Sequence, residues 1–307
     1  MPLSLFGIDE QAHTKRTDKT KKIFFIYSMS IKKGTLYIVS TPIGNLEDIT
    51  FRAIETLTNV DICASEDTRI SRVLFQRYGI VTKLVSYHKF SEKSKLNGFI
   101  NQLKSGKNIA LISDAGTPLI SDPGQYLVQA AIENQVQVVP TPGATSVIAA
   151  LTVSGFSSEN FTFYGFFPRK TKEQKKVLKK ISLSFGPSII FETGRRLKKL
   201  LDIMQQELEK STRILVAREM TKLHETFYRG DLRNITETIV ESEFGLKGEF
   251  VVVIDGSEKE INKTTPEDDQ RILEILMKKL DNKLALEIGS EILNKKRNEL
   301  YKIKLKD

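Results

Sequence analysis

The sequence has few residues of the kinds that form disulfides or bind metal ions. It contains a single cysteine, Cys63, and three histidines among 307 residues. One cysteine excludes a disulfide within the chain and a metal site built on a cysteine cluster. Because the histidines are scattered, we expect no metal centre, and the cysteine usage fits a reducing, cytoplasmic compartment.

Long apolar runs and the common nucleotide-binding motifs are also missing. No apolar run reaches the roughly 20 residues that a membrane span requires, so we expect no membrane segment. The absence of a Gly-x-Gly-x-x-Gly or Walker pattern counts against dinucleotide and nucleoside triphosphate sites. The Gly-rich loop that follows the first strand of the common methyltransferase fold is absent too.

The charge of the chain is unbalanced, with a formal net charge of +9. A surplus of this size suits an anionic partner such as nucleic acid, although a generally basic proteome explains it equally well. Residues 1–33 contain the polar, basic run Thr14–Lys22, which has no periodic apolar face. We expect 1–33 to form a flexible basic extension; a start at Met29 is the alternative, which mass spectrometry of the native N-terminus decides.

The order of the expected elements indicates an α/β protein with two domains. In residues 34–153 short apolar strands alternate with helices, among them a helix over residues 70–78, with Gly79 as the stop, and a helix over residues 96–104, which starts at Leu96. This alternation predicts a largely parallel sheet covered by helices on both faces. Residues 154–255 form a second α/β domain with more antiparallel character. Residues 256–307 are expected to form a linker and a small helical tail.

Three loops that contain proline and glycine follow strands of the first domain. They are Pro42–Gly44, Asp114–Gly124 and Pro142–Ser146. The second holds two turn clusters, more than a simple connection needs, and leads directly into a helix. Such loops gather at the carboxyl edge of a parallel sheet, where open α/β folds bind ligands. Together they favour a binding pocket over three plain connections.

Charged residues follow directly after buried strands at several points. The motif Glu66–Arg69 has two interpretations. In the first, Asp67 or Thr68 caps the next helix and Glu66 pairs with Arg69 or Arg72. In the second, the acid and guanidinium groups face a cleft and bind the sugar-phosphate of a substrate. The lysines after Pro168 are a solvated helix face, or with Arg195 and Arg196 they track a phosphate backbone. Both pairs of interpretations stay open.

Several motifs make the chain closely similar to the tetrapyrrole methylase-like (class III) superfamily, in particular to its branch that methylates small-subunit ribosomal RNA. The resemblance covers roughly residues 34–255 and departs at Glu192–Arg196, where the family has Glu-Ser-Pro-His-Arg, and at Lys89–Ser91. The motifs that carry it are Ser40–Thr50, Glu66–Arg69, Ser113–Gly124, Pro142–Leu151, Gly165–Lys170, Thr221–Glu225 and Gly248–Phe250.

The resemblance implies an enzyme with two α/β domains, a cofactor cleft between them and a helical tail. It implies S-adenosylmethionine as methyl donor, 2′-O-methylation of a cytidine in the decoding region of 16S rRNA within the 30S subunit, and a homodimer. A ribose hydroxyl is a poor nucleophile, so a base or an orienting group is expected beside it. The candidates, in order, are Asp67, Glu66 and Lys222.

The resemblance also implies which residues contact the donor and the RNA. The residues expected to bind the donor are Pro42, Ile43, Gly44, Asp114, Ala115, Gly116, Thr117, Pro118, Ile120, Ser121, Pro142, Gly143, Ser146, Phe191 and Ala217. The residues expected to hold RNA are Arg52, Arg69, Arg72, Arg169, Lys170, Arg195 and Arg196.

Two other functions remain open from the sequence. One is a small-molecule methylase that acts on a tetrapyrrole or a modified amino acid, against which the basic stretches and the motif Thr221–Glu225 count. The other is an RNA-binding assembly factor without catalytic activity. Transfer of labelled methyl groups distinguishes the first, and calorimetry with S-adenosylmethionine the second.

Overall fold

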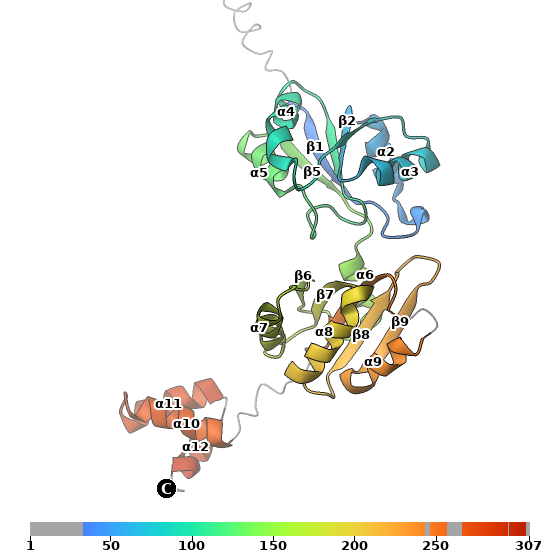
Figure 1. The fold of residues 1–307 in the computed structure, drawn as a ribbon. Helices are drawn as coiled ribbons and strands as arrows, with labels where there is room; N and C mark the ends of the chain where they lie inside the picture. The colour runs from blue at the N-terminus through green and yellow to red at the C-terminus, as the bar shows by residue number, and fades with distance from the viewer. Residues whose placement is uncertain (1–32, 243–245, 257–265, 294, 305–307) are drawn as a thin grey trace, which may run out of the picture.

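A computed structural model describes residues 33–242, 246–256, 266–293 and 295–304 (Figure 1). The first sheet is wholly parallel and has the strand order β3-β2-β4-β1-β5. Its strands are β1 (Thr35–Val39), β2 (Ile62–Ser65), β3 (Lys83–Ser86), β4 (Ile109–Ile112) and β5 (Gln137–Thr141). Since the order of the strands reverses beside β1 and β4, their carboxyl ends lie where such sheets bind ligands.

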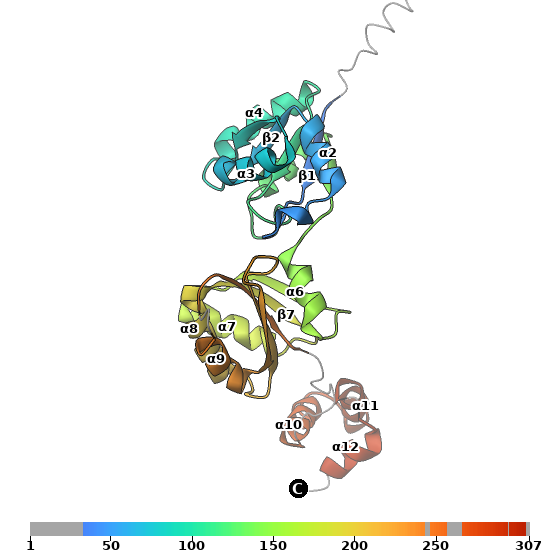
Figure 2. The ribbon, with the colours of Figure 1, turned by 90° about the vertical axis from the view of Figure 1, so that its right-hand side faces the viewer.

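Helices cover both faces of this sheet, as predicted (Figure 2). One apolar cluster lies under α4 and α5, and a second lies under α2 and α3. A short 3-10 helix, η1 (Leu46–Asp48), precedes α2. The α-helices are α2 (Phe51–Asn59), α3 (Thr68–Tyr78), α4 (Glu92–Lys104) and α5 (Gln125–Glu133).

Helix α4 begins four residues before the predicted start at Leu96. The reason is a contact between residues far apart in the sequence. The Glu92 side chain is buried, and its Oε1 accepts a hydrogen bond of 2.6 Å from the backbone N–H of Gly124. By contrast, the predicted end of α3 at Gly79 is confirmed, because this glycine adopts a left-handed φ of 66°.

The second sheet has the order β6-β7-β10-β8-β9. Only β6 and β7 are parallel, and the other pairs are antiparallel, which agrees with the predicted change in character. The strands are β6 (Thr162–Phe166), β7 (Ser188–Thr193), β8 (Arg213–Arg218), β9 (Thr226–Asp231) and β10 (Glu249–Ile254).

The two faces of the second sheet are covered unequally. Three helices, α7 (Thr171–Ile181), α8 (Gly194–Glu207) and α9 (Leu232–Val240), bury one face. On the other face lies α6 (Ser146–Ser154), whose Val147, Ala150 and Leu151 pack against Ile189 and Leu215 (Figure 2). Helix α6 thus packs on the second sheet although it follows a loop of the first, while the boundary at residues 153/154 stays a prediction.

Beyond β10 the chain forms a small helical unit, which confirms the expected tail. Helices α10 (Pro266–Met277), α11 (Asn282–Leu293) and α12 (Arg297–Lys304) share a core of leucines. Residues 1–32 and 257–265 lie outside the described residues, so the expected N-terminal extension and most of the linker are not tested. Among the described helices none is long and apolar enough to cross a membrane.

Candidate active site at the carboxyl edge of the first sheet

The first two proline- and glycine-containing loops pair with each other through their backbones. The Thr41 N–H donates to the Gly116 carbonyl at 2.9 Å, and the Gly116 N–H donates to the Thr41 carbonyl at 3.1 Å. A Cβ added to Gly116 would lie 3.2 Å from Ile43 Cγ2. The loops after β1 and β4 therefore form one continuous wall.

The Thr117 hydroxyl joins the third loop to this wall. Its Oγ1 lies 2.9 Å from the Ser40 hydroxyl and donates to the Ala144 carbonyl at 3.2 Å. Gly143 lies so close to Ser40 that an added Cβ would approach the Ser40 Cβ to 2.9 Å. The three loops predicted to converge do so, and one partly buried network around Thr117 joins them.

Two loops beside this network adopt costly backbone conformations. Leu119 and Ser121 both have a φ of 73°, while Glu219 and Thr221 of the loop between β8 and β9 have φ values of 47° and 62°. Among the described residues that are not glycine, only one other has a positive φ. Such conformations cost free energy and persist where the surrounding structure enforces them, often at functional sites.

The same two loops contact the opposite domain. The Asn45 N–H donates to Thr221 Oγ1 at 3.0 Å, and Gly165 lies so close to Ser121 that an added Cβ would be 3.1 Å from its Oγ. Ile43 packs against the apolar cluster of the second sheet. The converging loops thus lie at the junction between the two sheets.

Three carboxyl groups gather at the ends of β2 and β4. Burial, followed by the nearby negative charges of Asp122 and Asp114, raises the pKa of Glu66 to about 7. Burial likewise raises the pKa of Asp122 to about 6 and raises the pKa of Asp114. Asp114 Oδ1 also accepts a hydrogen bond of 2.9 Å from the Asp67 N–H, which links the two strand ends.

Asp67 has the capping role that was one of the two interpretations of its motif. It precedes α3, and its carboxylate accepts a hydrogen bond of 2.8 Å from the Arg69 N–H and lies 2.6 Å from Arg69 Nη2. Hydrogen bonds from the Arg69 side chain and backbone lower the pKa of Asp67 to about 2. The pairing of Glu66 with Arg69 or Arg72, which belonged to the same interpretation, is not observed: Arg69 binds Asp67, and among the described residues no ion pair joins Glu66 to Arg72.

Lys222 lies between two carboxylates. Its Nζ is 3.1 Å from Glu219 Oε1 and 2.8 Å from Glu249 Oε2. Burial by itself would lower the pKa of Lys222, but the hydrogen bonds to Glu249 and Glu219 outweigh it and raise the pKa. Lys222 is therefore a cation at neutral pH and has no free lone pair with which to accept a proton.

The residues expected to bind the donor differ in exposure. Gly44, Ala115, Ile120, Ser121, Pro142 and Gly143 are exposed, whereas Pro42, Gly116 and Pro118 are buried, and Ile43, Asp114, Thr117 and Ser146 are half-buried. The Phe191 ring stacks edge-on against Phe163 at 4.7 Å and Phe166 at 5.6 Å between ring centroids. Ala217 is 1% exposed within the cluster that α6 covers, so its contact with adenine remains a prediction.

The residues expected to hold RNA form two groups. Arg196 is tied to the protein: its Nη2 lies 2.9 Å from the buried Glu192 carboxylate and donates to the carbonyls of Phe167 and Pro168. Arg52 donates to the Pro140 carbonyl at 3.3 Å and Arg69 binds Asp67. The other predicted cations, Arg72, Arg169, Lys170 and Arg195, are exposed.

Asp122 and Glu92 were not among the predicted site residues. The motif Asp122–Gly124 suggests a turn, and only the folded chain brings its carboxyl beside Glu66. Glu92 holds the same loop from α4 through the Gly124 N–H. No spacing in the sequence relates these positions, because Asp122 lies in the loop after β4 and Glu92 begins α4.

The sequence-family model of the tetrapyrrole (corrin/porphyrin) methylases matches residues 35–236. The chain belongs to this family. It is 42% identical over 273 residues to the ribosomal RNA small subunit methyltransferase I of Haemophilus influenzae, covering 89% of this chain and 96% of that protein. It is 40% identical to the protein of the same name from Synechocystis, covering 89% and 98%.

Solved structures of the family share the fold. A diphthine synthase superposes with a TM-score of 0.57 at 14% identity, covering 72% of this chain and 89% of that one. The methyltransferase CobJ superposes with a TM-score of 0.55 at 15% identity, covering 72% and 94%. These likenesses establish the two-domain α/β architecture predicted from the sequence.

Methyltransferases generally use S-adenosylmethionine, and the donor set of this site suits that molecule. The donor carries a positive sulfonium, and the carboxyl groups of Asp114 and Asp122 supply negative charge at the loop junction. Ile120 and Ser121 of the loop after β4 are exposed beside these carboxyl groups. The residues present therefore fit this cofactor.

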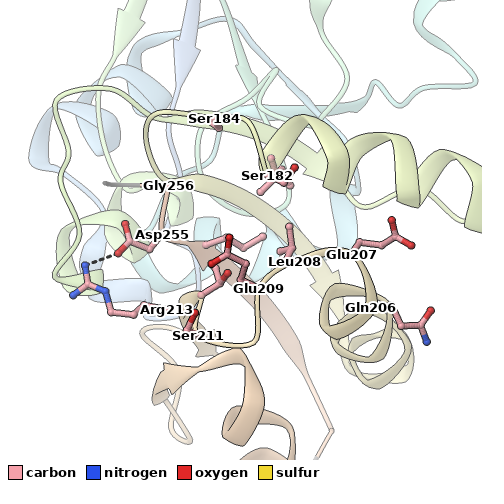
Figure 3. A pocket seen from close by; sticks show the side chains of 13 residues that line it. Ser182, Ser184, Gln206, Glu207, Leu208, Glu209, Ser211, Arg213, Asp255 and Gly256 are labelled. Carbon is pink, nitrogen blue, oxygen red and sulfur yellow. Dashed lines mark hydrogen bonds and ion pairs between the residues drawn. The ribbon is translucent and has the colours of Figure 1, made fainter. Parts of the chain in front are cut away.

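A separate hollow lies at the opposite edge of the second sheet (Figure 3). Its volume is about 690 Å³, and it is lined by the ends of α7, α8 and β10 and by the start of β8. An ion pair of 2.5 Å between Arg213 and Asp255 spans it. Since Arg213 begins β8, whose other end at Arg218 faces the junction, this hollow is not the candidate active site.

Proposed function

We propose that this chain is an S-adenosylmethionine-dependent methyltransferase that modifies the 2′-hydroxyl of a cytidine in the decoding region of 16S rRNA, acting on the 30S subunit. The observation that carries the proposal is the network around Thr117, which joins three loops beside a cluster of carboxyl groups at the domain junction. Relatives named for small-subunit ribosomal RNA methylation, at 40–42% identity, give the substrate class.

Glu66 is the proposed general base. The bound donor supplies an activated methyl group, and transfer is a displacement in line with its sulfonium, so orientation contributes much of the rate. The ribose hydroxyl must lose a proton as the new C–O bond forms. A carboxyl whose pKa is about 7 is well matched to accept it at neutral pH.

The other two candidates are less suited to this role. Asp67 has a pKa of about 2 and is bound to Arg69, so it is a weak base. Lys222 is protonated between Glu219 and Glu249, and these ion pairs stabilise its loop. We keep Asp67 as a capping residue and Lys222 as a residue that positions Thr221 beside Asn45.

The donor is held by the three loops and the substrate by exposed cations. Asp114, the backbone of Ala115–Ser121, and Pro142 and Gly143 line the donor side, with Phe191 beside the adenine. Arg72, Arg169, Lys170 and Arg195 contact phosphates, and the 2′-hydroxyl distinguishes RNA from DNA. A homodimer in the cytoplasm, where ribosomal subunits assemble, completes the proposal.

A transfer assay with methyl-labelled S-adenosylmethionine tests this function. Unmodified 30S subunits, free 16S rRNA and a porphyrinoid are offered in parallel. We expect label in the rRNA of 30S subunits and in an alkali-resistant dinucleotide, because 2′-O-methylation blocks alkaline cleavage. Label in the porphyrinoid, label on a base, or no label with donor binding absent by calorimetry contradicts the proposal.

A further inference from the structure

We infer that the outward faces of α7 and α8 form a binding surface for the RNA phosphate backbone, which leads away from the site of methyl transfer. This inference rests on the proposed function and extends it to residues beyond the exposed cations named above. We call this surface the α7–α8 basic face. It consists of Lys172, Lys176, Lys179, Lys180, Lys198 and Lys199.

Helix α7 has one basic side and one buried side. Gln174, Leu178 and Ile181 are buried against the sheet, while Lys172, Lys176, Lys179 and Lys180 are exposed. At 3.6 residues per turn, these four lysines fall within about 100° of the helix circumference. The lysines thus share the side that faces away from the core.

Helix α8 packs beside α7 (Figure 1). Lys198 and Lys199 are exposed on the side opposite Leu197, Leu200 and Leu201. An ion pair of 2.6 Å between Lys175 and Glu207 joins the two helices. Lys175 therefore has a structural partner, and we leave it out of the basic face.

The six lysines of the basic face carry charge that the protein itself does not neutralise. In the described part of the chain no carboxylate lies within ion-pair distance of any of them. Glu173, beside Lys170, and Asp202, on α8, are the exposed acids on these helices. Much of the net charge of +9 is therefore concentrated on one side of the second domain.

The basic face starts beside the proposed active site. Strands β6 and β7 are parallel, and α7 and α8 follow their carboxyl ends. Gly165, near the end of β6, contacts Ser121 of the donor loop. From there α7, with 11 residues, extends about 16 Å at 1.5 Å per residue, which gives a strand of RNA a continuous path from the junction.

The chemistry of this face favours a phosphate backbone over a protein partner. Protein interfaces have aromatic and apolar anchors at their centres, whereas no large apolar side chain is exposed within α7 or α8. Lysine ammonium groups on flexible stems contact phosphates as point charges without a fixed geometry. Such a surface holds RNA in register without reading its sequence.

The test compares two triple variants with the same loss of charge. Lys172→Gln/Lys176→Gln/Lys179→Gln removes half of the basic face and keeps good helix formers. The matched control, Lys83→Gln/Lys104→Gln/Lys107→Gln, removes three exposed lysines at the amino edge of the first sheet. Affinity for unmodified 30S subunits is measured at several salt concentrations, together with thermal unfolding and donor affinity by calorimetry.

We expect the α7 triple variant to bind 30S subunits at least ~10-fold more weakly. The slope of log K against log salt should become shallower by about 2, because each of the three lost phosphate contacts contributes ~0.7 to it. The control should stay within about twofold, with donor affinity and melting temperature unchanged in both variants. Equal weakening in both variants, or none in the α7 variant, overturns the inference. If wild-type protein neither binds nor labels 30S subunits, the proposed function is overturned as well. If wild-type protein labels 30S subunits normally and the α7 variant binds them as tightly, only the inference about the α7–α8 basic face is overturned.

Discussion

Glu66 and Asp67 are neighbours in the sequence, yet their environments separate their acidities. Glu66 is half-buried, and this partial burial together with the nearby charges of Asp122 and Asp114 raises its pKa to about 7. Asp67 caps α3 and binds Arg69, which lowers its pKa to about 2. Acidities so far apart suit the different roles that we propose for these adjacent carboxyls, one in proton transfer and one in local structure.

Replacing Glu66 tests its assignment as the base. For Glu66→Gln we expect the single-turnover rate of methyl transfer to 30S subunits to fall about 100-fold or more, with donor affinity nearly unchanged. The wild-type rate should rise with pH and level off above about 7 as Glu66 ionises. The control Asp67→Asn keeps a capping side chain and should retain the rate within about fivefold and the same pH profile. If only Asp67→Asn loses activity, the assignment is reversed.

The same substitution should stabilise the protein at alkaline pH. The pKa of Glu66 is raised from 4.5 in the unfolded chain to about 7, so the folded state binds more protons and stability falls as pH rises through this range. Because the group is partly solvated, we expect Glu66→Gln to gain only about 1 kcal/mol at pH 8 and nothing at pH 4. Urea unfolding at the two pH values measures this difference, and a gain that is equal at both would rule out the linkage.

Arg196 should contribute to the stability of the protein, whereas Arg195 should contribute to binding of 30S subunits. Arg196 is the partner of Glu192, whose side chain is 1% exposed, so Arg196→Gln should destabilise the protein by about 3 kcal/mol by leaving a buried charge. Arg195 is exposed and lacks such a partner, so Arg195→Gln should keep the stability and weaken 30S binding. Urea unfolding and binding measurements on both variants check this, and a stable Arg196→Gln that has lost RNA affinity would contradict it.

At the scale of elements, the alternation of strands and helices was predictable because apolar periodicity and turn residues record local structure. Gly79, for example, marks the end of α3 through its left-handed conformation. Two features were not predictable. Helix α4 starts early because Glu92 binds the Gly124 N–H, and α6 packs on the second sheet through Val147 and Leu151. Both depend on contacts between distant residues.

The candidate site, too, has some features that the local sequence predicts and others that depend on contacts between distant residues. Proline and glycine indicated the three loops and hence their convergence. The lowered pKa of Asp67, the raised pKa of Asp122 and the ion pair of the buried Glu192 with Arg196 depend on neighbours that only the folded chain brings together. Residue identities therefore predicted where the site lies better than the state of its ionisable groups.

The convergence of the loops should fail when the Thr117 hydroxyl is removed. Thr117→Val keeps the side-chain shape but removes the contacts with Ser40 and Ala144. We expect about 1–2 kcal/mol less stability and about tenfold weaker donor binding by calorimetry, since the loops lose their fixed arrangement. Thr117→Ser keeps the hydroxyl and serves as the control. Unchanged donor affinity in Thr117→Val would show that the network does not form the cradle.

In the molecule as a whole, the two α/β domains meet at the proposed site of methyl transfer. The Asn45–Thr221 hydrogen bond and the Ser121–Gly165 contact join them on either side of the converging loops. The carboxyl groups lie on the first domain and the dense lysine surface on the second. This division suits a cationic donor on one side and an anionic RNA on the other.

A map of ribose methylation in 16S rRNA tests the enzyme assignment most directly. Subunits are compared from cells that lack this protein and from cells in which wild-type protein or Glu66→Gln is restored. We expect one 2′-O-methylated cytidine in the decoding region to disappear without the protein, to return with the wild type and to stay absent with Glu66→Gln. A map that does not change when the protein is removed, or full restoration by Glu66→Gln, would contradict the account.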